Sequence, residues 1–284
     1  MVKEIAVLGG DRRQHYLAKA LQKTGISVIS YAVPGFADTR ATLEETLADA
    51  GVVILPLPAL DRKGDLFCTD ETHISIEAIA AGLRRDALLF GGKLDAAAEL
   101  LSRRAQVADY FQWEPLTLAN AVPTAEGAIQ LAMEHTDCTL FDSELLVIGA
   151  GRIGTCLALR LKALGAHVTV TARKDADLAR LRTLGLGTDT TGKYARGLEQ
   201  YDGLFNTVPA PVLTLRQLRA LREDCPLIEL ASAPGGFSPE DCKTARRHYL
   251  SGAALPGKVA PRTAGELIAG EILSYIRRSP WNNL

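Results

Sequence analysis

The stretch VIGAGRIG, from Val147 to Gly154, has the composition and spacing of a phosphate-binding turn. Gly149, Gly151 and Gly154 form the pattern G-x-G-x-x-G, with an apolar run before them and a helical pattern from Ile153 to Leu164. In such a turn the first glycine permits a tight bend, the second lets the backbone approach a pyrophosphate, and the third allows close packing of helix on strand. Free N–H groups and the positive end of the helix dipole then face the phosphate charge. The stretch predicts a dinucleotide site; the alternative is a glycine-rich turn with only a structural role.

The end of the next expected strand bears on which nicotinamide dinucleotide is bound. About twenty residues after the first glycine, an NAD site presents Asp or Glu to the ribose 2′-hydroxyl, whereas an arginine there accommodates the 2′-phosphate of NADP. Here the strand ends in TVTARK, which offers Thr171, Arg173 and Lys174. Asp175 follows slightly too late and is interpreted as a cap of the next helix. The sequence therefore favours NADP over NAD.

Two further loops are expected at the same edge of the sheet, because ligands of a doubly wound sheet collect at the carboxyl ends of its strands. NTVPAP follows one expected strand, near the nicotinamide or its ribose, and LASAPGGF follows the next. The predicted cofactor-binding residues are Gly149, Gly151, Arg152, Ile153, Gly154, Thr171, Arg173, Lys174, Asn206, Thr207, Pro209 and Ser232.

A similar turn near the N-terminus, GGDRRQ, lacks the features that a pyrophosphate needs. Asp11 and Gln14 stand where the second and third glycines would be, and a carboxylate at Asp11 would repel the phosphates. The cofactor is therefore expected only in the half of the chain that contains Gly149, Gly151 and Gly154. Arg12 and Arg13 open a helix, where the dipole disfavours cations. Either Asp11 is an N-cap with solvated arginines beside it, or the turn is an anion site in which an arginine holds a substrate carboxylate.

Other candidate groups are less specific. Lys93 follows a strand and two glycines in FGGK, so it is either a surface lysine or a side chain that reaches into a cleft between domains. Glu126 is either a capping residue of a linker helix or a proton acceptor, and Thr124 precedes it. Five dispersed histidines form no metal-binding pattern, and neither a G-x-S-x-G elbow nor a Walker loop is present. No metal site is expected.

The elements that must position these residues form an α/β pattern. The chain has 284 residues, and at ~150 residues per domain two domains are expected. Short β-branched runs alternate with amphipathic stretches, as in βαβ units around parallel sheets. We predict strands at 4–9, 27–32, 51–57, 87–92, 106–111, 144–149, 167–172, 203–208, 226–231 and 248–253.

The predicted fold is α/β, with two Rossmann-like doubly wound parallel-sheet domains and an interdomain cleft. Residues 1–118 form a substrate domain, and residues 119–262 form the dinucleotide-binding domain, including a linker helix that begins at Pro123 and Thr124. A C-terminal helix in 263–284, stopped by Pro280, is expected to pack back on the first domain.

Composition narrows the class of protein. A formal net charge of -1 gives no support to nucleic-acid binding, and no apolar run approaches the ~20 residues of a membrane-spanning helix. The N-terminus has no secretory pattern. Five scattered cysteines without a C-x-x-C pair indicate neither a disulfide framework nor a zinc site. We expect a cytoplasmic protein with no membrane or nucleic-acid partner.

Taken together, GGDRR, NAVPTAEGAI, GAGRIG with VTARK, NTVPAP and ALPGKVAPRTAGE resemble, in order along the chain, the A subunit of bacterial dipicolinate synthase. The resemblance implies a sporulation-associated oxidoreductase that makes dipicolinate from dihydrodipicolinate or its hydrated precursor. It also implies that the partner is a flavoprotein-like B subunit, and that the fold is similar to alanine dehydrogenases and D-2-hydroxyacid dehydrogenases. A homo-oligomer is expected.

Alanine or 2-hydroxyacid oxidation is the alternative activity, and one residue weighs against it. The segment VAPRTAG resembles a T-P-H-x-A-G motif of D-2-hydroxyacid dehydrogenases, in which the histidine is the acid and base, but this chain has Arg262 there. Arginine stays protonated, yet it can bind a carboxylate bidentately. The predicted substrate-binding residues are Arg12, Arg13, Lys93, Thr124 and Arg262, and the base is left open between Lys93 and Glu126. A second alternative is an NADP-binding scaffold whose partner performs the chemistry.

Overall fold

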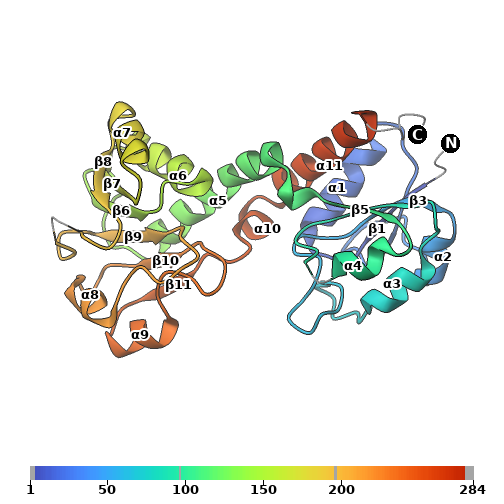
Figure 1. Cartoon of the computed structure of the whole chain (residues 1–284), viewed down its shortest axis with the longest axis horizontal. Helices are drawn as coiled ribbons and strands as arrows, with labels where there is room; N and C mark the ends of the chain where they lie inside the picture. The colour runs from blue at the N-terminus through green and yellow to red at the C-terminus, as the bar shows by residue number, and fades with distance from the viewer. Residues whose placement is uncertain (1–3, 96, 195–196, 279–284) are drawn as a thin grey trace. The chain divides into compact units, whose positions relative to one another are not determined.

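The computed structural model describes residues 4–95, 97–194 and 197–278 and divides into two compact units (Figure 1). Unit 1 comprises residues 1–120 and 260–284, and unit 2 comprises residues 121–259. Each unit has one parallel sheet with helices on both faces, which confirms the predicted class of two Rossmann-like domains. No helix among the described residues has the length and apolar character needed to cross a membrane.

Unit 1 contains a five-stranded sheet with the order β2-β1-β3-β4-β5. Its strands are β1 (Glu4–Leu8), β2 (Val28–Tyr31), β3 (Ala50–Ile54), β4 (Leu88–Gly91) and β5 (Gln106–Asp109). Its helices are α1 (Arg12–Gln22), α2 (Leu43–Ala48), α3 (Ile76–Gly82), α4 (Ala97–Ser102), the 3-10 turn η1 (Tyr110–Gln112) and α11 (Pro261–Arg278). α1 and α11 pack on one face of the sheet, and α2, α3 and α4 pack on the other. This is the flavodoxin-like order, whose switch point lies between β1 and β3.

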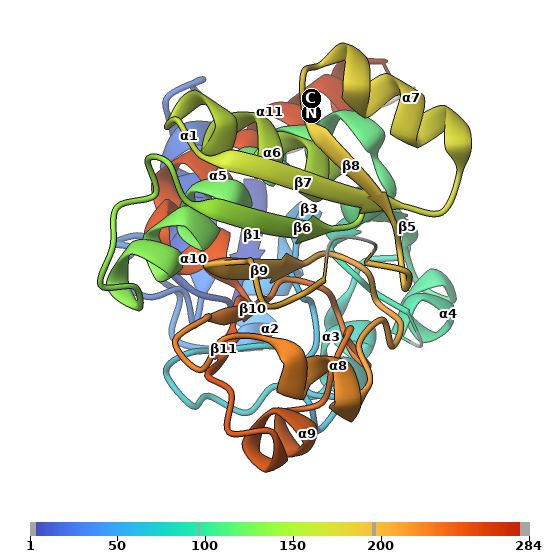
Figure 2. The ribbon, with the colours of Figure 1, turned by 90° about the vertical axis from the view of Figure 1, so that its left-hand side faces the viewer.

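Unit 2 contains a six-stranded parallel sheet with the order β11-β10-β9-β6-β7-β8 (Figure 2). Its strands are β6 (Glu144–Ile148), β7 (His167–Ala172), β8 (Gly187–Thr190), β9 (Gly203–Asn206), β10 (Leu227–Glu229) and β11 (Tyr249–Ser251). Its helices are α5 (Glu114–Glu134), which begins in unit 1, α6 (Arg152–Ala163), α7 (Asp175–Thr183), α8 (Leu215–Ala220), α9 (Pro239–Thr244) and α10 (Leu255–Val259). Numbered from β6, this is the classical dinucleotide-binding order 3-2-1-4-5-6.

Each of the ten predicted segments overlaps a strand, and one strand of the described residues was not predicted. β8 has the sequence GTDT and pairs with β7 at the edge of the sheet. An edge strand buries little of its surface, so it does not need the β-branched apolar run that identifies the other strands.

The linker helix begins earlier than predicted. α5 starts at Glu114 and continues through Pro123, and the boundary between the two units falls after Asn120. A proline inside a helix removes one hydrogen bond and crowds the preceding turn, which is why the sequence pattern favoured a helix start at Pro123. The structure tolerates it within a helix of 21 residues. Glu126 therefore lies far from the first turn, and its interpretation as a capping residue is wrong.

α11 lies directly against α1. A Cβ atom on Gly265 would collide with the carbonyl oxygen of Arg13 and would lie 2.9 Å from the amide nitrogen of Leu17. Further along α11, Tyr275 stacks on Trp113 with ring centroids 5.0 Å apart. α11 is described to Arg278; Pro280 and the rest of the predicted 263–284 segment lie outside the described residues.

We predict that Gly265→Ala lowers the free energy of unfolding of unit 1 by about 1 to 3 kcal/mol, because the added methyl group must push two backbones apart. Gly270→Ala is the matched control. Nothing lies within 4 Å of a Cβ at that position, so this change in the same helix should stabilise by about 0.5 to 1 kcal/mol. Urea unfolding followed by tryptophan fluorescence measures both effects. Equal stabilisation by the two changes would show that the helices are not in close contact.

Candidate functional site

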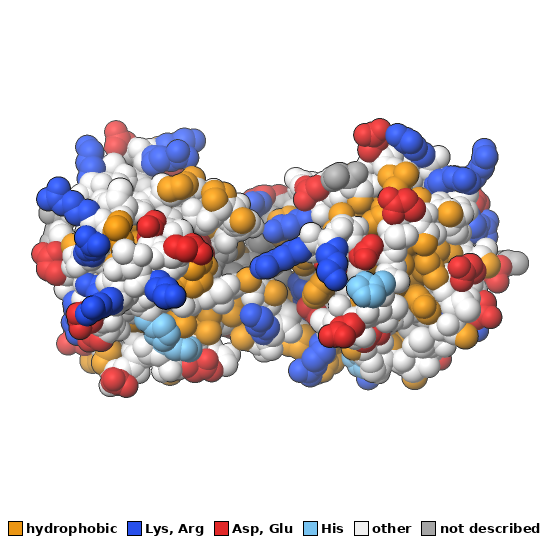
Figure 3. All heavy atoms as spheres, turned by 90° about the horizontal axis from the view of Figure 1, so that it is seen from below, with side chains coloured by type: hydrophobic (Ala, Val, Ile, Leu, Met, Phe, Trp, Pro, Cys, Tyr) orange, Lys and Arg blue, Asp and Glu red, His pale blue; other side chains and the backbone are white. Residues whose placement is uncertain are grey.

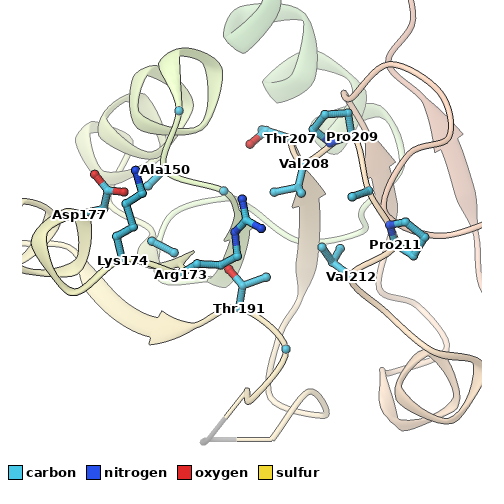
Figure 4. A pocket seen from close by; sticks show the side chains of 15 residues that line it. Ala150, Arg173, Lys174, Asp177, Thr191, Thr207, Val208, Pro209, Pro211 and Val212 are labelled. Atoms are coloured by element: carbon cyan, nitrogen blue, oxygen red, sulfur yellow. The ribbon is translucent and has the colours of Figure 1, made fainter.

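A cavity of about 580 Å³ lies at the carboxyl ends of β6, β7 and β9, within the range of small-ligand pockets (Figure 4). Six of the predicted cofactor residues line it: Gly149, Gly151, Arg173, Lys174, Thr207 and Pro209. The others in its wall were not predicted: Ala150, Ala172, Asp177, Thr191, Gly192, Val208, Ala210, Pro211 and Val212. Thr191 and Gly192 follow β8, so no sequence signal placed them at this edge.

The three glycines of the turn have different physical roles. Gly149 has φ +107, and a Cβ there would collide with Oγ1 of Thr207. A Cβ on Gly154 would collide with the carbonyl oxygen of Gly149. Nothing lies within 4 Å of a Cβ on Gly151. The fold itself therefore requires the first and third glycines, whereas the second leaves open space at the cavity wall.

The N-terminus of α6 faces this space without a side-chain cap. Gly151 is the N-cap residue and has no side chain that could accept a hydrogen bond from the first turn. The free N–H groups of a helix start, together with the helix dipole, stabilise an anion placed there. The residues present therefore fit a pyrophosphate.

Two cationic side chains also line this cavity. Arg173 follows β7, and Lys174 is the N-cap of α7; Figure 4 shows both side chains at the cavity, with Asp177 close to Lys174. Asp177 is 3.9 Å from Nη2 of Arg180, which also donates to the carbonyl oxygen of Ala150 at 3.1 Å. Asp175 is the first residue of α7 and does not line the cavity. The end of β7 thus presents Arg173 and Lys174, and the carboxylate of Asp177 lines the same cavity.

The remaining predicted cofactor residues do not line the cavity. Arg152, Ile153 and Gly154 form the first turn of α6, and Ser232 follows β10. The other two are buried and bonded internally. Thr171 shares a hydrogen bond of 2.9 Å with Thr191, and Asn206 donates to Glu229 at 2.7 Å.

Glu229 is a buried acidic residue that sequence reasoning missed. It is 6% exposed at the end of β10, and burial raises the pKa of its carboxyl group, against the opposing effect of the hydrogen bonds that it accepts. Its only signal in the sequence was one acidic residue inside the apolar run LIELA.

The N-terminal turn of unit 1 is filled by its own side chains. Asp11 caps α1 by accepting from the backbone N–H of Arg13, and it also pairs with the Arg13 side chain at 2.8 Å. The same guanidinium donates to the carbonyl oxygen of Leu57, beyond the end of β3. Arg13 is 5% exposed, so the expectation that both arginines are solvated is wrong for Arg13. Arg12 is exposed, with its Nη2 3.4 Å from the Tyr16 hydroxyl.

Arg262 lies in the same unit as Arg12. It stands in the first turn of α11, is largely exposed, and donates through Nε to Glu266 at 3.0 Å. The hydrogen bond that Arg262 donates to Glu266, together with the negative charge of that carboxylate, raises the pKa of Arg262. The predicted dinucleotide-binding domain, residues 119–262, included Arg262, whereas the structure places this residue in unit 1.

The last candidates are divided between the units. In unit 1, Lys93 has its Nζ 5.0 Å from the centroid of the Phe111 ring. In unit 2, Thr124 is buried in α5, and Glu126 lies 3.9 Å from Nε of Arg160. In residues 4–95, 97–194 and 197–278, no three His, Cys, Asp or Glu side chains are grouped as metal ligands. Acidic and basic side chains both occur over each unit on the face that Figure 3 shows.

We predict that Gly151→Asp abolishes binding of NADP and NAD while the chain stays folded. The site has room for the side chain, but the carboxylate would occupy the space above α6 and repel a pyrophosphate, as Asp11 would in unit 1. Calorimetry measures binding, and circular dichroism checks the fold. Gly154→Ala is the contrasting variant, since it should damage the fold itself. Normal nucleotide binding by folded Gly151→Asp would make the turn purely structural.

Comparisons with known proteins agree with this architecture. Residues 4–110 match the family model for the N-terminal domain of the dipicolinate synthase A subunit. The dipicolinate synthase A subunit of Bacillus subtilis (strain 168) is 30% identical over 277 residues, which cover 94% of this chain and 93% of that protein. The crystal structure of the dipicolinate synthase A subunit from Bacillus halodurans has a TM-score of 0.86, with 27% identity and 99% of each chain covered.

A more distant likeness concerns the fold alone. An L-alanine dehydrogenase structure has a TM-score of 0.65 at 17% identity, covering 96% of this chain and 88% of that one. The relatives of higher identity span nearly the whole chain. This chain therefore belongs to the family of dipicolinate synthase A subunits.

Proposed function

We propose that this protein catalyses the NADP-dependent dehydrogenation of dihydrodipicolinate, or of its hydrated precursor, to dipicolinate during sporulation. The observation that carries the proposal is the cavity over the uncapped N-terminus of α6, with Arg173 and Lys174 beside it, in a chain of this family. The pyrophosphate would lie against Gly149 and Gly151 at the start of α6, and the two cations would bind the 2′-phosphate.

The reaction needs orientation more than activation. Dihydrodipicolinate loses one hydride and one proton and becomes an aromatic dicarboxylate; a hydrated precursor must also lose water. The nicotinamide, when bound, accepts the hydride. The residues of this chain must hold a dianion in one orientation and receive the proton, and such positioning by itself can account for a large part of a rate enhancement. Lys93 and Glu126 remain the candidate bases.

Unit 1 supplies the proposed carboxylate partners. Arg12 lies in the first turn of α1, with its Nη2 3.4 Å from the Tyr16 hydroxyl, and Arg262 lies in the first turn of α11, which packs on α1. Arg13 lies at the switch point between β1 and β3, where sheets of this order bind ligands, but it is already engaged by Asp11 and Leu57. We therefore propose Arg12 and Arg262 as direct carboxylate contacts, with Arg13 supporting the turn; Lys93 and Thr124 remain proposed contacts.

Two alternatives differ in what they require. 2-Hydroxyacid oxidation, by the resemblance of VAPRTAG to the D-2-hydroxyacid dehydrogenase motif, would need an acid and base at position 262, where arginine cannot serve. Alanine oxidation remains the other alternative of this class. An NADP-binding scaffold would bind the nucleotide while a flavoprotein-like B subunit performs the chemistry. A cytoplasmic homo-oligomer that associates with such a partner is part of the proposal.

We predict that Arg173→Ala weakens NADP binding by about 1 to 3 kcal/mol, the effect of lost charge-assisted hydrogen bonds, and changes NAD binding much less. Arg182→Ala is the matched control, because Arg182 lies on α7 outside the cavity and donates to Thr188 instead. Calorimetric titrations with both nucleotides measure the difference. Equal affinity of the unchanged chain for NAD and NADP would contradict the assignment.

Turnover tests the whole proposal. The purified chain, given the dihydrodipicolinate precursor and NADP, should produce NADPH, measured by its absorbance. We expect Arg12→Ala and Arg262→Ala to raise KM for the precursor and leave the affinity for NADP unchanged. Arg84→Ala provides the control, since Arg84 is another exposed, ion-paired arginine of unit 1. NADPH formation that requires addition of the flavoprotein-like partner would favour the scaffold instead.

A further inference from the structure

Glu229 connects two loops beside the cavity through one carboxylate. Its Oε1 accepts from Nδ2 of Asn206 at 2.7 Å and from the backbone N–H of Ala231 at 2.8 Å. Its Oε2 accepts from the backbone N–H of Gly236 at 2.8 Å. The loop after β9 and the loop after β10 therefore share a single buried anchor.

The contacts of Asn206 and Gly236 extend this anchor along the loop after β9. Asn206 donates to the carbonyl oxygen of Val208 at 2.9 Å and accepts from its backbone N–H at 3.1 Å. At the other end of the loop, the backbone N–H of Val212 donates to the carbonyl oxygen of Gly236 at 2.8 Å. Both ends of the segment 208–212 are thus connected to Glu229, Val208 through Asn206 and Val212 through Gly236.

The packing leaves little freedom around this anchor. A Cβ on Gly236 would collide with Nδ2 of Asn206 and lie 2.7 Å from a methyl group of Val212. A Cβ on Gly235, which has φ +79, would lie 2.9 Å from Oε2 of Glu229. The two glycines let the second loop close over the carboxylate.

A carboxylate is a costly group to bury, and its chemistry explains its presence here. Among the described hydrogen bonds it accepts three and donates none. An ionised carboxylate has acceptor oxygens at both positions, whereas a glutamine amide has one acceptor and one donor group. In either orientation, the amide would turn an NH2 group toward at least one of these N–H donors.

We infer that Glu229 is a positioning residue that holds the segment 208–212 in its binding arrangement before a dinucleotide arrives. The inference rests on the proposed function, because it takes the cavity as the dinucleotide site. Val208 and Val212 both line that cavity, on the side away from Lys174 and Asp177 (Figure 4). A wall that is already ordered does not lose conformational freedom on binding, which strengthens affinity.

Glu229→Gln tests this role with two independent measurements. We expect an affinity for NADP about tenfold weaker by calorimetry, from the lost acceptor and the loosened wall. Hydrogen exchange should become faster at the backbone N–H groups of Val208, Ala231 and Gly236. Saturating NADP should slow that exchange again. If Glu229→Gln does not fold, Asn206→Ala replaces it in the same measurements. This change removes the hydrogen bonds that connect Glu229 to Val208.

Asp202→Asn is the matched control. Asp202 accepts from the backbone N–H of Glu144 at 2.8 Å and pairs with Arg222 at 2.6 Å. These contacts lie at the amino ends of β6 and β9, whereas Glu229 lies at the carboxyl end of β10. The change also converts a carboxylate that accepts a backbone N–H to an amide, but it should leave NADP affinity and loop exchange unchanged.

The outcomes separate the inference from the proposed function. Unchanged NADP affinity and unchanged exchange in folded Glu229→Gln would overturn the positioning role. An equal loss of affinity in Asp202→Asn would overturn it too, since the effect would then follow general stability. If the unchanged chain bound neither NADP nor NAD, the proposed function would fall. Exchange at the three N–H groups would then decide by itself whether Glu229 holds the loops.

Discussion

The N-terminus of α6, where Gly151 gives no side-chain cap, is the feature on which the candidate site depends. A helix start leaves N–H groups unpaired unless a side chain accepts from them. Gly151 supplies no such side chain, and Gly149 and Gly154 permit the tight turn that brings β6 and α6 together. The result is a positive, open space at the edge of the sheet. Arg173 and Lys174 add charge to it from the neighbouring strand end.

The corresponding turn of unit 1 differs, because a side chain caps its helix. Asp11 caps α1, and its carboxylate also holds the guanidinium of Arg13, which reaches the loop after β3. The start of α1 thus has a side-chain hydrogen-bond acceptor, whereas the start of α6 in unit 2 has none. The two units therefore share a strand-turn-helix plan but differ in what the turn can accept. Their strand orders differ as well, flavodoxin-like in unit 1 and the classical dinucleotide order in unit 2.

The walls of the cavity depend on contacts between loops far apart in sequence. Glu229 and Asn206 lie at the ends of adjacent parallel strands, so the sheet brings their side chains together. Buried polar groups of this kind must be fully paired, and once paired they specify one arrangement. The loops after β9 and β10 are consequently defined by one carboxylate that itself lies outside the cavity.

Local patterns were enough to predict the elements and the turn. The apolar runs identified ten strands because most of these strands are largely buried, and tight contacts within the turn require glycine at Gly149 and Gly154. The cations after β7 could be predicted because they follow the turn at a fixed distance along the chain. The order of motifs along the whole chain also indicated the family. These features depend on residues near one another in sequence.

Tertiary structure decided what depends on distant partners. β8 is polar because it lies at a sheet edge, so Thr191 and Gly192 entered the cavity without a local signal. Pro123 remains inside α5 although its local preference is for a helix start. Arg13 is engaged by a carbonyl group 44 residues away, and Arg262 joins unit 1 because Gly265 lets α11 pack on α1. Asn206 and Glu229 face each other because parallel pairing aligns their strand ends, which spacing along the chain cannot express.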